Sequence, residues 1–137
     1  MKLDKNQSGF TLLEIIIVII IIGVLASLAL PRFVKTVEFS RSTEALTALG
    51  TIRRSMDICY QPTQNYQPCL GFAQLSILDP GAGVGAHWGY TWPAPGVGTY
   101  LITARRNSTV DGGVTTDTIT INQDGTKTGT TNFAGIR

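Results

Sequence analysis

The sequence is poor in the residues that most often carry out chemistry. It contains one histidine, His87, and two cysteines, Cys59 and Cys69, in 137 residues. A zinc site needs about four ligands of these types, and no serine or cysteine has an evident orienting partner in the pattern around it. The glycine-rich stretch 79–89 lacks the spacing, followed by Lys and Ser or Thr, that holds phosphate. We therefore expect no enzyme activity, no metal and no cofactor, and interpret His87 as structural.

Charge is also sparse. Asp, Glu, Lys and Arg make up 15% of the residues, and the formal net charge is +2. Lys and Arg are scattered rather than gathered in a basic stripe, which argues against a nucleic-acid partner. The length allows at most one globular domain beside any apolar segment.

What the sequence does contain is one long apolar run near its N-terminus. From Phe10 to Leu30 it has 21 residues, and Glu14 is their only ionisable side chain. A helix of this length extends about 31 Å, against about 30 Å for the hydrocarbon core of a bilayer. A carboxylate in that layer costs up to about 2.5–3.5 kcal/mol at the centre, so by default it marks a function and a partner.

Three interpretations of the first thirty residues compete. An ordinary secretory signal would use Lys2 and Lys5 as its charged region and Ser27-Leu28-Ala29 as its cleavage site. A permanent signal anchor would tolerate Glu14 at the membrane interface, but both interpretations give this carboxylate nothing to do. Cleavage in front of Phe10 would create a cationic α-amine, with which Glu14 could pair in a low-dielectric setting.

The third interpretation is supported by a resemblance. The leader MKLDKNQSG ends in Gly9 and is followed by Phe-Thr-Leu-Leu-Glu, with Gly23 and Pro31 further along the apolar segment. These residues resemble the class III signal of type IV pilins and pseudopilins, and the resemblance covers residues 1 to about 60 well. It implies that a prepilin peptidase cuts after Gly9, that Phe10 is N-methylated, and that Glu14 registers each subunit on the amine of its neighbour.

The resemblance also implies a function, partners and a location. The protein would be a structural subunit of a type IV pilus or pilus-like filament, assembled into a homopolymer by an inner-membrane platform and, indirectly, an assembly ATPase. It would lie in the inner membrane, in contact with lipid, before assembly and in an extracellular pilus or periplasmic filament afterwards. A major pilin is favoured over a type II secretion pseudopilin because no calcium-site loop is recognisable. A minor pilin and a non-polymerising secreted or signal-anchored binding protein remain as competing interpretations.

Gly23 and Pro31 are predicted weak points of the helix. Proline removes one backbone hydrogen bond and clashes with the preceding turn, so Pro31 should bend the helix. In filaments of the resembling family, the stretch between two such residues loses helical order. The alternative is that Gly23 only permits close helix packing and Pro31 only bends the chain.

Beyond Pro31 the pattern becomes that of an amphipathic helix. Apolar residues recur at spacings of four and three: Ala45, Leu49, Ile52, Met56 and Cys59. We predict one helix from Phe10 to about Cys59, ended by Tyr60-Gln61-Pro62. The expected organisation is a cleaved leader (1–9), a transmembrane or filament-core helix (10–31), the amphipathic helix of a head (32–60), and the loop and sheet of that head (61–137).

The C-terminal part shows strand signals. They cover 87–92, 99–106, 115–122 and, more weakly, 126–130, and Asp124-Gly125 is a candidate for a tight hairpin turn. A short helical turn is expected within 71–78, and a further turn at 111–113. The predicted fold class is α+β, in which the long N-terminal helix packs against a three- or four-stranded antiparallel sheet, as in type IV pilins.

The two cysteines lie close together in sequence. An even pair on a chain with an export signal favours a disulfide between Cys59 and Cys69, and two unrelated buried thiols are the alternative. The bond would close a ring of 11 residues, worth just under about 3 kcal/mol from loop entropy. Its position departs from the resembling family, in which the disulfide lies near the C-terminus.

Overall fold

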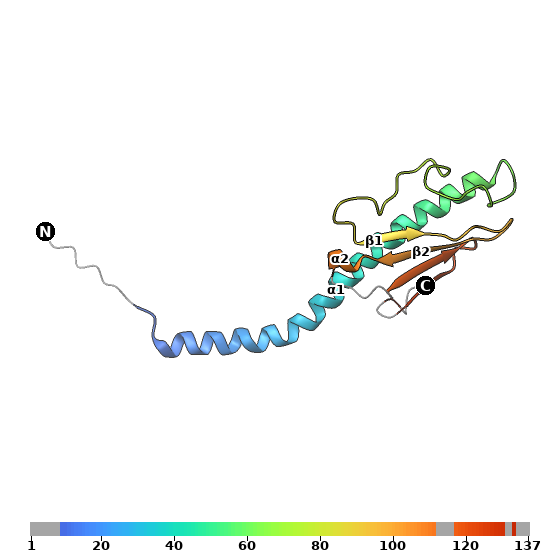
Figure 1. Ribbon diagram of the computed structural model, residues 1–137. Helices are drawn as coiled ribbons and strands as arrows, with labels where there is room; N and C mark the ends of the chain where they lie inside the picture. The colour runs from blue at the N-terminus through green and yellow to red at the C-terminus, as the bar shows by residue number, and fades with distance from the viewer. Residues whose placement is uncertain (1–8, 112–116, 131–132, 134–137) are drawn as a thin grey trace. The chain divides into compact units, whose positions relative to one another are not determined.

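A computed structural model of the chain describes residues 9–111, 117–130 and 133. The element order is α1 (Leu12–Tyr60), β1 (Trp88–Thr91), β2 (Leu101–Arg106), α2 (Ser108–Asp111), β3 (Thr118–Asn122) and β4 (Lys127–Gly129) (Figure 1). The chain divides into two compact units, one ending at Val37 and the other beginning at Glu38, and α1 contributes to both. The predicted α+β fold is confirmed.

The described part of the first unit is dominated by the beginning of α1. The helix starts at Leu12, two residues later than predicted, because Thr11 caps it: the Glu14 N–H donates to Thr11 Oγ1 at 3.2 Å. Thr11 and Glu14 have the spacing of a capping box. The helix continues through Gly23 and Pro31, so their weakening in a filament stays a prediction.

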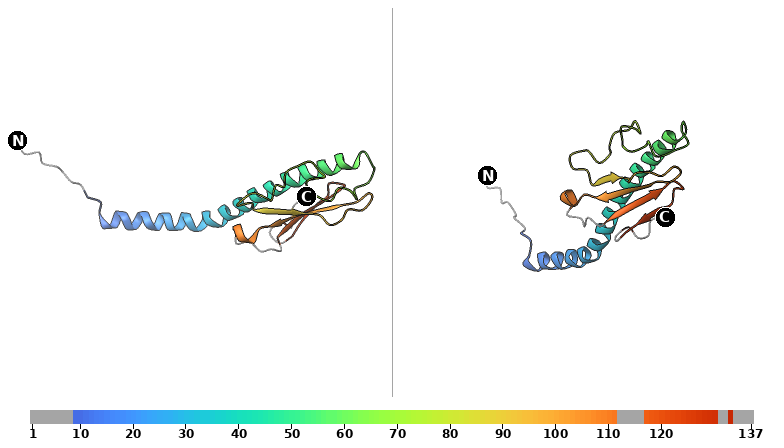
Figure 2. Two further views of the ribbon diagram at one scale, coloured as in Figure 1. Left: turned by 45° about the horizontal axis from the view of Figure 1, so that its top comes forward. Right: turned by 45° about the vertical axis from the view of Figure 1, so that its right-hand side comes forward.

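The second unit packs the part of α1 from Glu38 onward against a four-stranded sheet. The strands follow the order β1-β2-β3-β4, and each pair of neighbours is antiparallel. Figure 2 shows the sheet beside this part of α1 in both views. Alternate strand residues point toward the helix because successive side chains lie on opposite faces. The core contains Ala45, Leu49, Ile52 and Met56 from α1, Trp88 and Tyr90 from β1, Ile102 and Ala104 from β2, and Ile119 and Ile121 from β3.

The predicted disulfide is present. Cys59, near the end of α1, is bonded to Cys69 in the following loop, and their Cα atoms are 6.2 Å apart. Cys69 is buried, and its carbonyl accepts a hydrogen bond from Trp92 Nε1 at 2.9 Å. The bond therefore fastens the connecting segment between α1 and the residue that follows β1.

The structure confirms one of the local features predicted from the sequence and differs from another. Gly125 has a φ of 83°, which glycine adopts readily, and its N–H donates to the Asn122 carbonyl at 3.0 Å. The hairpin predicted at Asp124-Gly125 is thus confirmed. Within 71–78 the chain forms consecutive turns rather than a helix, with one helical-type bond from Leu75 N–H to the Gly71 carbonyl.

Helix α2 was not predicted. Asn107 Oδ1 accepts a hydrogen bond from the Thr109 N–H at 3.1 Å, which starts this short turn directly after β2. Several predictions fall wholly or partly outside the described residues. They are the leader before Gly9, the later part of the turn at 111–113, and the beginning of the third strand at 115–116.

Candidate functional site

The segment that contains the predicted cleavage point is exposed. Gly9 and Phe10 lie in a non-helical stretch directly before Thr11 and α1, and the Phe10 side chain is 79% exposed. A Cβ atom built on Gly9 would meet nothing within 4 Å. The Gly9–Phe10 peptide bond is therefore open to approach from solution.

Glu14 lies in the first turn of α1 and is exposed. At this place a carboxylate interacts favourably with the helix dipole, which is worth about 0.3–1 kcal/mol. Among the residues that the structure describes, no Lys or Arg is within ion-pair distance of its carboxylate. Within the described residues the Glu14 carboxylate therefore has no cationic side chain as a partner.

The apolar part of α1 is not covered by any other described part of the chain. All described residues up to Thr36 are exposed, and this part of α1 is long and apolar enough to cross a membrane. Its helical backbone satisfies its own hydrogen bonds, which a lipid environment requires. A helix that is apolar on all sides is stable where lipid or other helices surround it.

A cluster of charged side chains in the second unit was not predicted. Arg106 Nη1 and Nη2 donate to Glu38 Oε2 and Oε1 at 2.8 and 2.9 Å. Arg106 Nη1 also lies 3.4 Å from Asp117 Oδ2, and Arg41 Nη1 lies 3.1 Å from Glu38 Oε1. Arg106 and Asp117 are both buried. The two parallel bonds between Arg106 and Glu38 are the strong, bidentate form of this pair.

The cluster ties α1 to the sheet. Trp88 Nε1, from β1, donates to the Arg41 carbonyl at 3.0 Å, and the Arg106 N–H donates to the Asp117 carbonyl at 3.0 Å. A signal was present in the sequence, because Ile102, Ala104 and Arg106 share one strand face. A buried arginine on the core face needs a carboxylate as its partner. The strand pattern does not indicate which Asp or Glu is that partner.

Two further contacts hold the head together. Arg53 Nη2 donates to the Gln123 carbonyl at 3.1 Å, which fixes the β3–β4 turn on α1. The Tyr66 hydroxyl donates to Asp57 Oδ1 at 3.2 Å.

Burial raises the pKa of Tyr66, Tyr90 and Tyr100 above the usual tyrosine value, and nearby acidic side chains add to the effect.

Within the part of the chain that the structure describes, no three His, Cys, Asp or Glu side chains are grouped so that they could hold a metal ion. The carbonyl of His87 accepts a hydrogen bond from the Asn107 N–H at 2.8 Å, directly before β1.

Comparison with known proteins favours the third interpretation of the N-terminus. Residues 4–30 match the family described as the prokaryotic N-terminal methylation motif. Type IV major fimbrial protein FimA of Dichelobacter nodosus is 29% identical over 106 residues, which are 77% of this chain and 67% of the relative. Type II secretion system core protein G of Escherichia coli is 36% identical over 79 residues, or 58% of this chain and 54% of the relative.

The chain carries this methylation motif and is similar to type IV pilins and to a type II secretion core protein. Type IV major pilin protein PilA of Myxococcus xanthus is also similar, at 33% identity over 75 residues, which are 53% of this chain and 34% of the relative. The matches to three FimA sequences span 67%, 61% and 47% of those relatives. The motif that this chain matches contains Gly9, Phe10, Glu14 and Gly23, and it ends one residue before Pro31.

Proposed function

We propose that this protein is a structural subunit of a type IV pilus or pilus-like filament. The observation that carries the proposal is the exposed apolar part of α1, headed by Gly9-Phe10 and by a carboxylate without an ionic partner in the described residues. Lipid would cover this helix before assembly, and the same helix of neighbouring subunits would cover it in the filament. In this function the protein is a building block and not an enzyme.

Glu14 has a specific role in this proposal. After cleavage, the α-amine of Phe10 is cationic and lies four residues before Glu14 in the same chain. This pair is close but not well directed within one helix, whereas a subunit displaced along the filament can present its amine directly to a neighbour's Glu14. Pairing would neutralise both charges in a low-dielectric setting, where each alone is costly. It would favour transfer of the subunit from the bilayer into the filament.

The remaining partners follow from this assembly route. A prepilin peptidase would remove residues 1–9, and an inner-membrane platform, driven indirectly by an ATPase, would add subunits through residues 10–31. Residues 32–60 and 61–137 would form the head. The final location would be an extracellular pilus or a periplasmic filament. Similarity to FimA and PilA, both named as major subunits, favours a major pilin, and similarity to core protein G favours the pseudopilin alternative.

The test is an intact mass, with N-terminal sequencing, of the protein from sheared surface fibres and from membranes. We expect a chain that begins at N-methylated Phe10, is two hydrogens lighter because of the disulfide, and is abundant in the sheared fraction. A Gly9→Val variant is the matched control and should keep its leader and stay in the membrane. A chain that begins at Leu30 and is free in the medium would contradict the proposal, because it would identify an ordinary secretory signal.

A further inference from the structure

The face of the sheet turned away from α1 carries two rows of residues that cross the strands, and all of them except Arg105 have short side chains or none. In the first row Thr91 pairs with Thr103, Thr103 with Thr120, and Thr120 with Thr128. In the second row Gly89 pairs with Arg105 and Arg105 with Thr118. Neighbouring positions in such a row are about 4.8 Å apart. Arg105 is the only charged side chain in either row.

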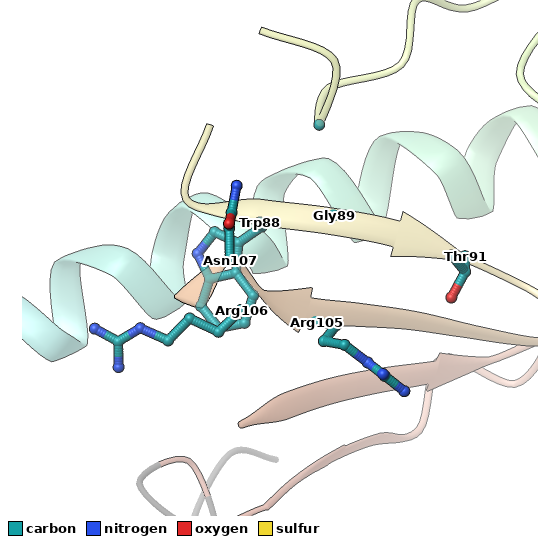
Figure 3. A pocket seen from close by; sticks show the side chains of 7 residues that line it. Trp88, Gly89, Thr91, Arg105, Arg106 and Asn107 are labelled. Atoms are coloured by element: carbon teal, nitrogen blue, oxygen red, sulfur yellow. The ribbon is translucent and has the colours of Figure 1, made fainter. Parts of the chain in front are cut away.

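A hollow of about 410 Å³ lies where these rows reach β1. Gly89 brings no side chain into the hollow, and a Cβ atom built there would meet nothing within 4 Å. Figure 3 shows Gly89 and Thr91 on β1 and Arg105 on the neighbouring strand β2. The described residues that form its walls are Gly81, Trp88, Gly89, Thr91, Arg105, Arg106 and Asn107, and none of these is acidic.

The polar groups at this end of the rows are available to a ligand. Within the described residues, neither the guanidinium of Arg105 nor the hydroxyls of Thr91 and Thr103 form a hydrogen bond or ion pair. The other end of the first row differs, because the hydroxyls of Thr120 and Thr128 are bonded to each other at 2.6 Å. The hollow thus combines the Arg105 cation and the Thr91 hydroxyl with the bare backbone of Gly89, and Thr103 lies beside Thr91 in the first row.

We propose that this hollow binds a sugar that carries a carboxylate, as a uronic acid does. The planar guanidinium of Arg105 can donate two parallel hydrogen bonds to a carboxylate. The sugar ring would lie over Gly89, and its hydroxyl groups would exchange hydrogen bonds with Thr91 in the hollow and with Thr103 beside it in the first row. Both hydroxyls can donate and accept. This binding does not depend on assembly, but a filament would repeat the site along its length and raise the avidity for an acidic polysaccharide.

The experiment uses the full-length protein in detergent micelles and follows the side-chain N–H signal of Arg105 by NMR. The probes are glucuronate, acetate as a carboxylate without a sugar, and glucose as a sugar without a carboxylate. We expect glucuronate to give a saturable shift with a dissociation constant at least about five-fold lower than that of acetate, because acetate lacks the hydroxyl contacts. Glucose should give no saturable shift, because it lacks the charge that Arg105 binds.

Two substitutions and one control locate the site. Binding to these variants is measured from the backbone N–H signals around the hollow. Arg105→Gln should weaken glucuronate binding at least about ten-fold because it removes the charge-assisted bonds. Gly89→Ala should weaken it about three-fold or more, because the added methyl group occupies the floor without touching the protein. Arg54→Gln removes another exposed arginine, on α1, and should change nothing. The proposal is overturned if no saturable shift appears, if acetate or glucose binds as tightly as glucuronate, if Arg54→Gln weakens binding as much as Arg105→Gln, or if Gly89→Ala has no effect.

Discussion

Arg105 and Arg106 are adjacent in β2 but lie in opposite environments. Arg105 is exposed on the outer face of the sheet, whereas Arg106 is buried and donates to Glu38 on α1. The difference follows from strand geometry, because successive side chains point to opposite faces. The same substitution at these two positions should therefore have very different effects.

Arg106→Gln should lower the free energy of unfolding by about 3 kcal/mol, the lower end of the range for a broken buried pair. The lower end applies because Glu38 keeps some contact with water. The measurement is urea unfolding of the full chain in detergent, followed by the fluorescence of the buried Trp88. Arg105→Gln is the control and should change stability by less than about 0.5 kcal/mol. Equal losses for the two variants would contradict the assigned role of Arg106.

Glu14→Gln separates the two roles of Glu14, which are the local capping of α1 and the ionic pair with a neighbouring subunit. Glutamine keeps the capping-box pattern with Thr11 but removes the charge. We expect the variant to accumulate in the membrane like the unchanged protein and to appear in sheared fibres at least about ten-fold less, equivalent to about 1.4 kcal/mol. Immunoblots of both fractions measure this ratio.

Thr11→Ala is the complementary variant. It removes the hydroxyl that accepts from the Glu14 N–H, at a cost of about 1 kcal/mol in helix capping, but it keeps the charge. Assembly should survive this change. If Thr11→Ala abolished fibres and Glu14→Gln did not, the local cap rather than the intersubunit pair would be the function of Glu14.

At the scale of elements, the loop after α1 is held by one covalent bond and by aromatic packing. Tyr66 stacks on Tyr60 with ring centroids 4.3 Å apart and contacts Tyr100 edge-on at 4.7 Å. The Cys59–Cys69 bond spans a sequence separation of 10. These contacts position the segment that leads into β1.

The double variant Cys59→Ser/Cys69→Ser should be less stable by just under about 3 kcal/mol, the loop-entropy value for a ring of this size. The chain keeps its fold because the core of α1 and the sheet does not depend on the bond. Urea unfolding under oxidising and reducing conditions measures the loss. The reduced natural protein should match the double variant, and a stability unaffected by reductant would show that the bond contributes nothing.

The buried tyrosines predict a loss of stability at high pH. Burial raises the pKa of Tyr90 and Tyr100 in the folded protein, while the unfolded value stays at about 10. Above pH about 10 the unfolded chain therefore binds fewer protons than the folded one, so stability falls as the pH rises. Below that pH the contribution is fully present.

Thermal unfolding between pH 8 and 12 tests this prediction. The double variant Tyr90→Phe/Tyr100→Phe should lose less stability over this range than the natural protein, because it has fewer groups to ionise on unfolding. Tyr60→Phe, at a partly exposed ring, is the control and should follow the natural profile. Identical slopes for all three proteins would show that these hydroxyls do not set the high-pH limit.

At the scale of the whole molecule, the two units have opposite relations to water. The first exposes apolar side chains on every side of α1, whereas the second has its own core and a polar outer sheet face. The second unit should therefore fold without the apolar helix.

A shortened chain of residues 35–137 tests this division. It keeps Glu38 and Arg41, which the charged cluster needs, and removes the apolar segment. We expect a monomer in detergent-free buffer with the disulfide formed and with the near-UV circular dichroism of the full chain, but without incorporation into fibres. The full chain, which should aggregate in the same buffer, is the control. Aggregation of the shortened chain would mean that the head needs the first unit to fold.

Features that depend on neighbouring residues could be predicted from the sequence. The end of α1 near Cys59, the hairpin at Asp124-Gly125 and the alternation in β3 follow from local turn chemistry and from periods of 3.6 and 2. The matched N-terminal motif is equally local, because Gly9, Phe10 and Glu14 lie within six residues of sequence. Helix α2 was missed because a single Asn107 side chain starts it.

Sequence alone determined the apolar helix, its exposed carboxylate and the class of fold, because composition and periodicity fix which surfaces must avoid water. Tertiary structure decided which charges meet. Glu38 and Arg106 are separated by 68 positions in the chain, and only strand register and helix packing bring them together. The same packing places Arg105 opposite Gly89 and forms the hollow that residues of both β1 and β2 line. Long-range pairing depends on how every element packs, so no local pattern in the sequence encodes it.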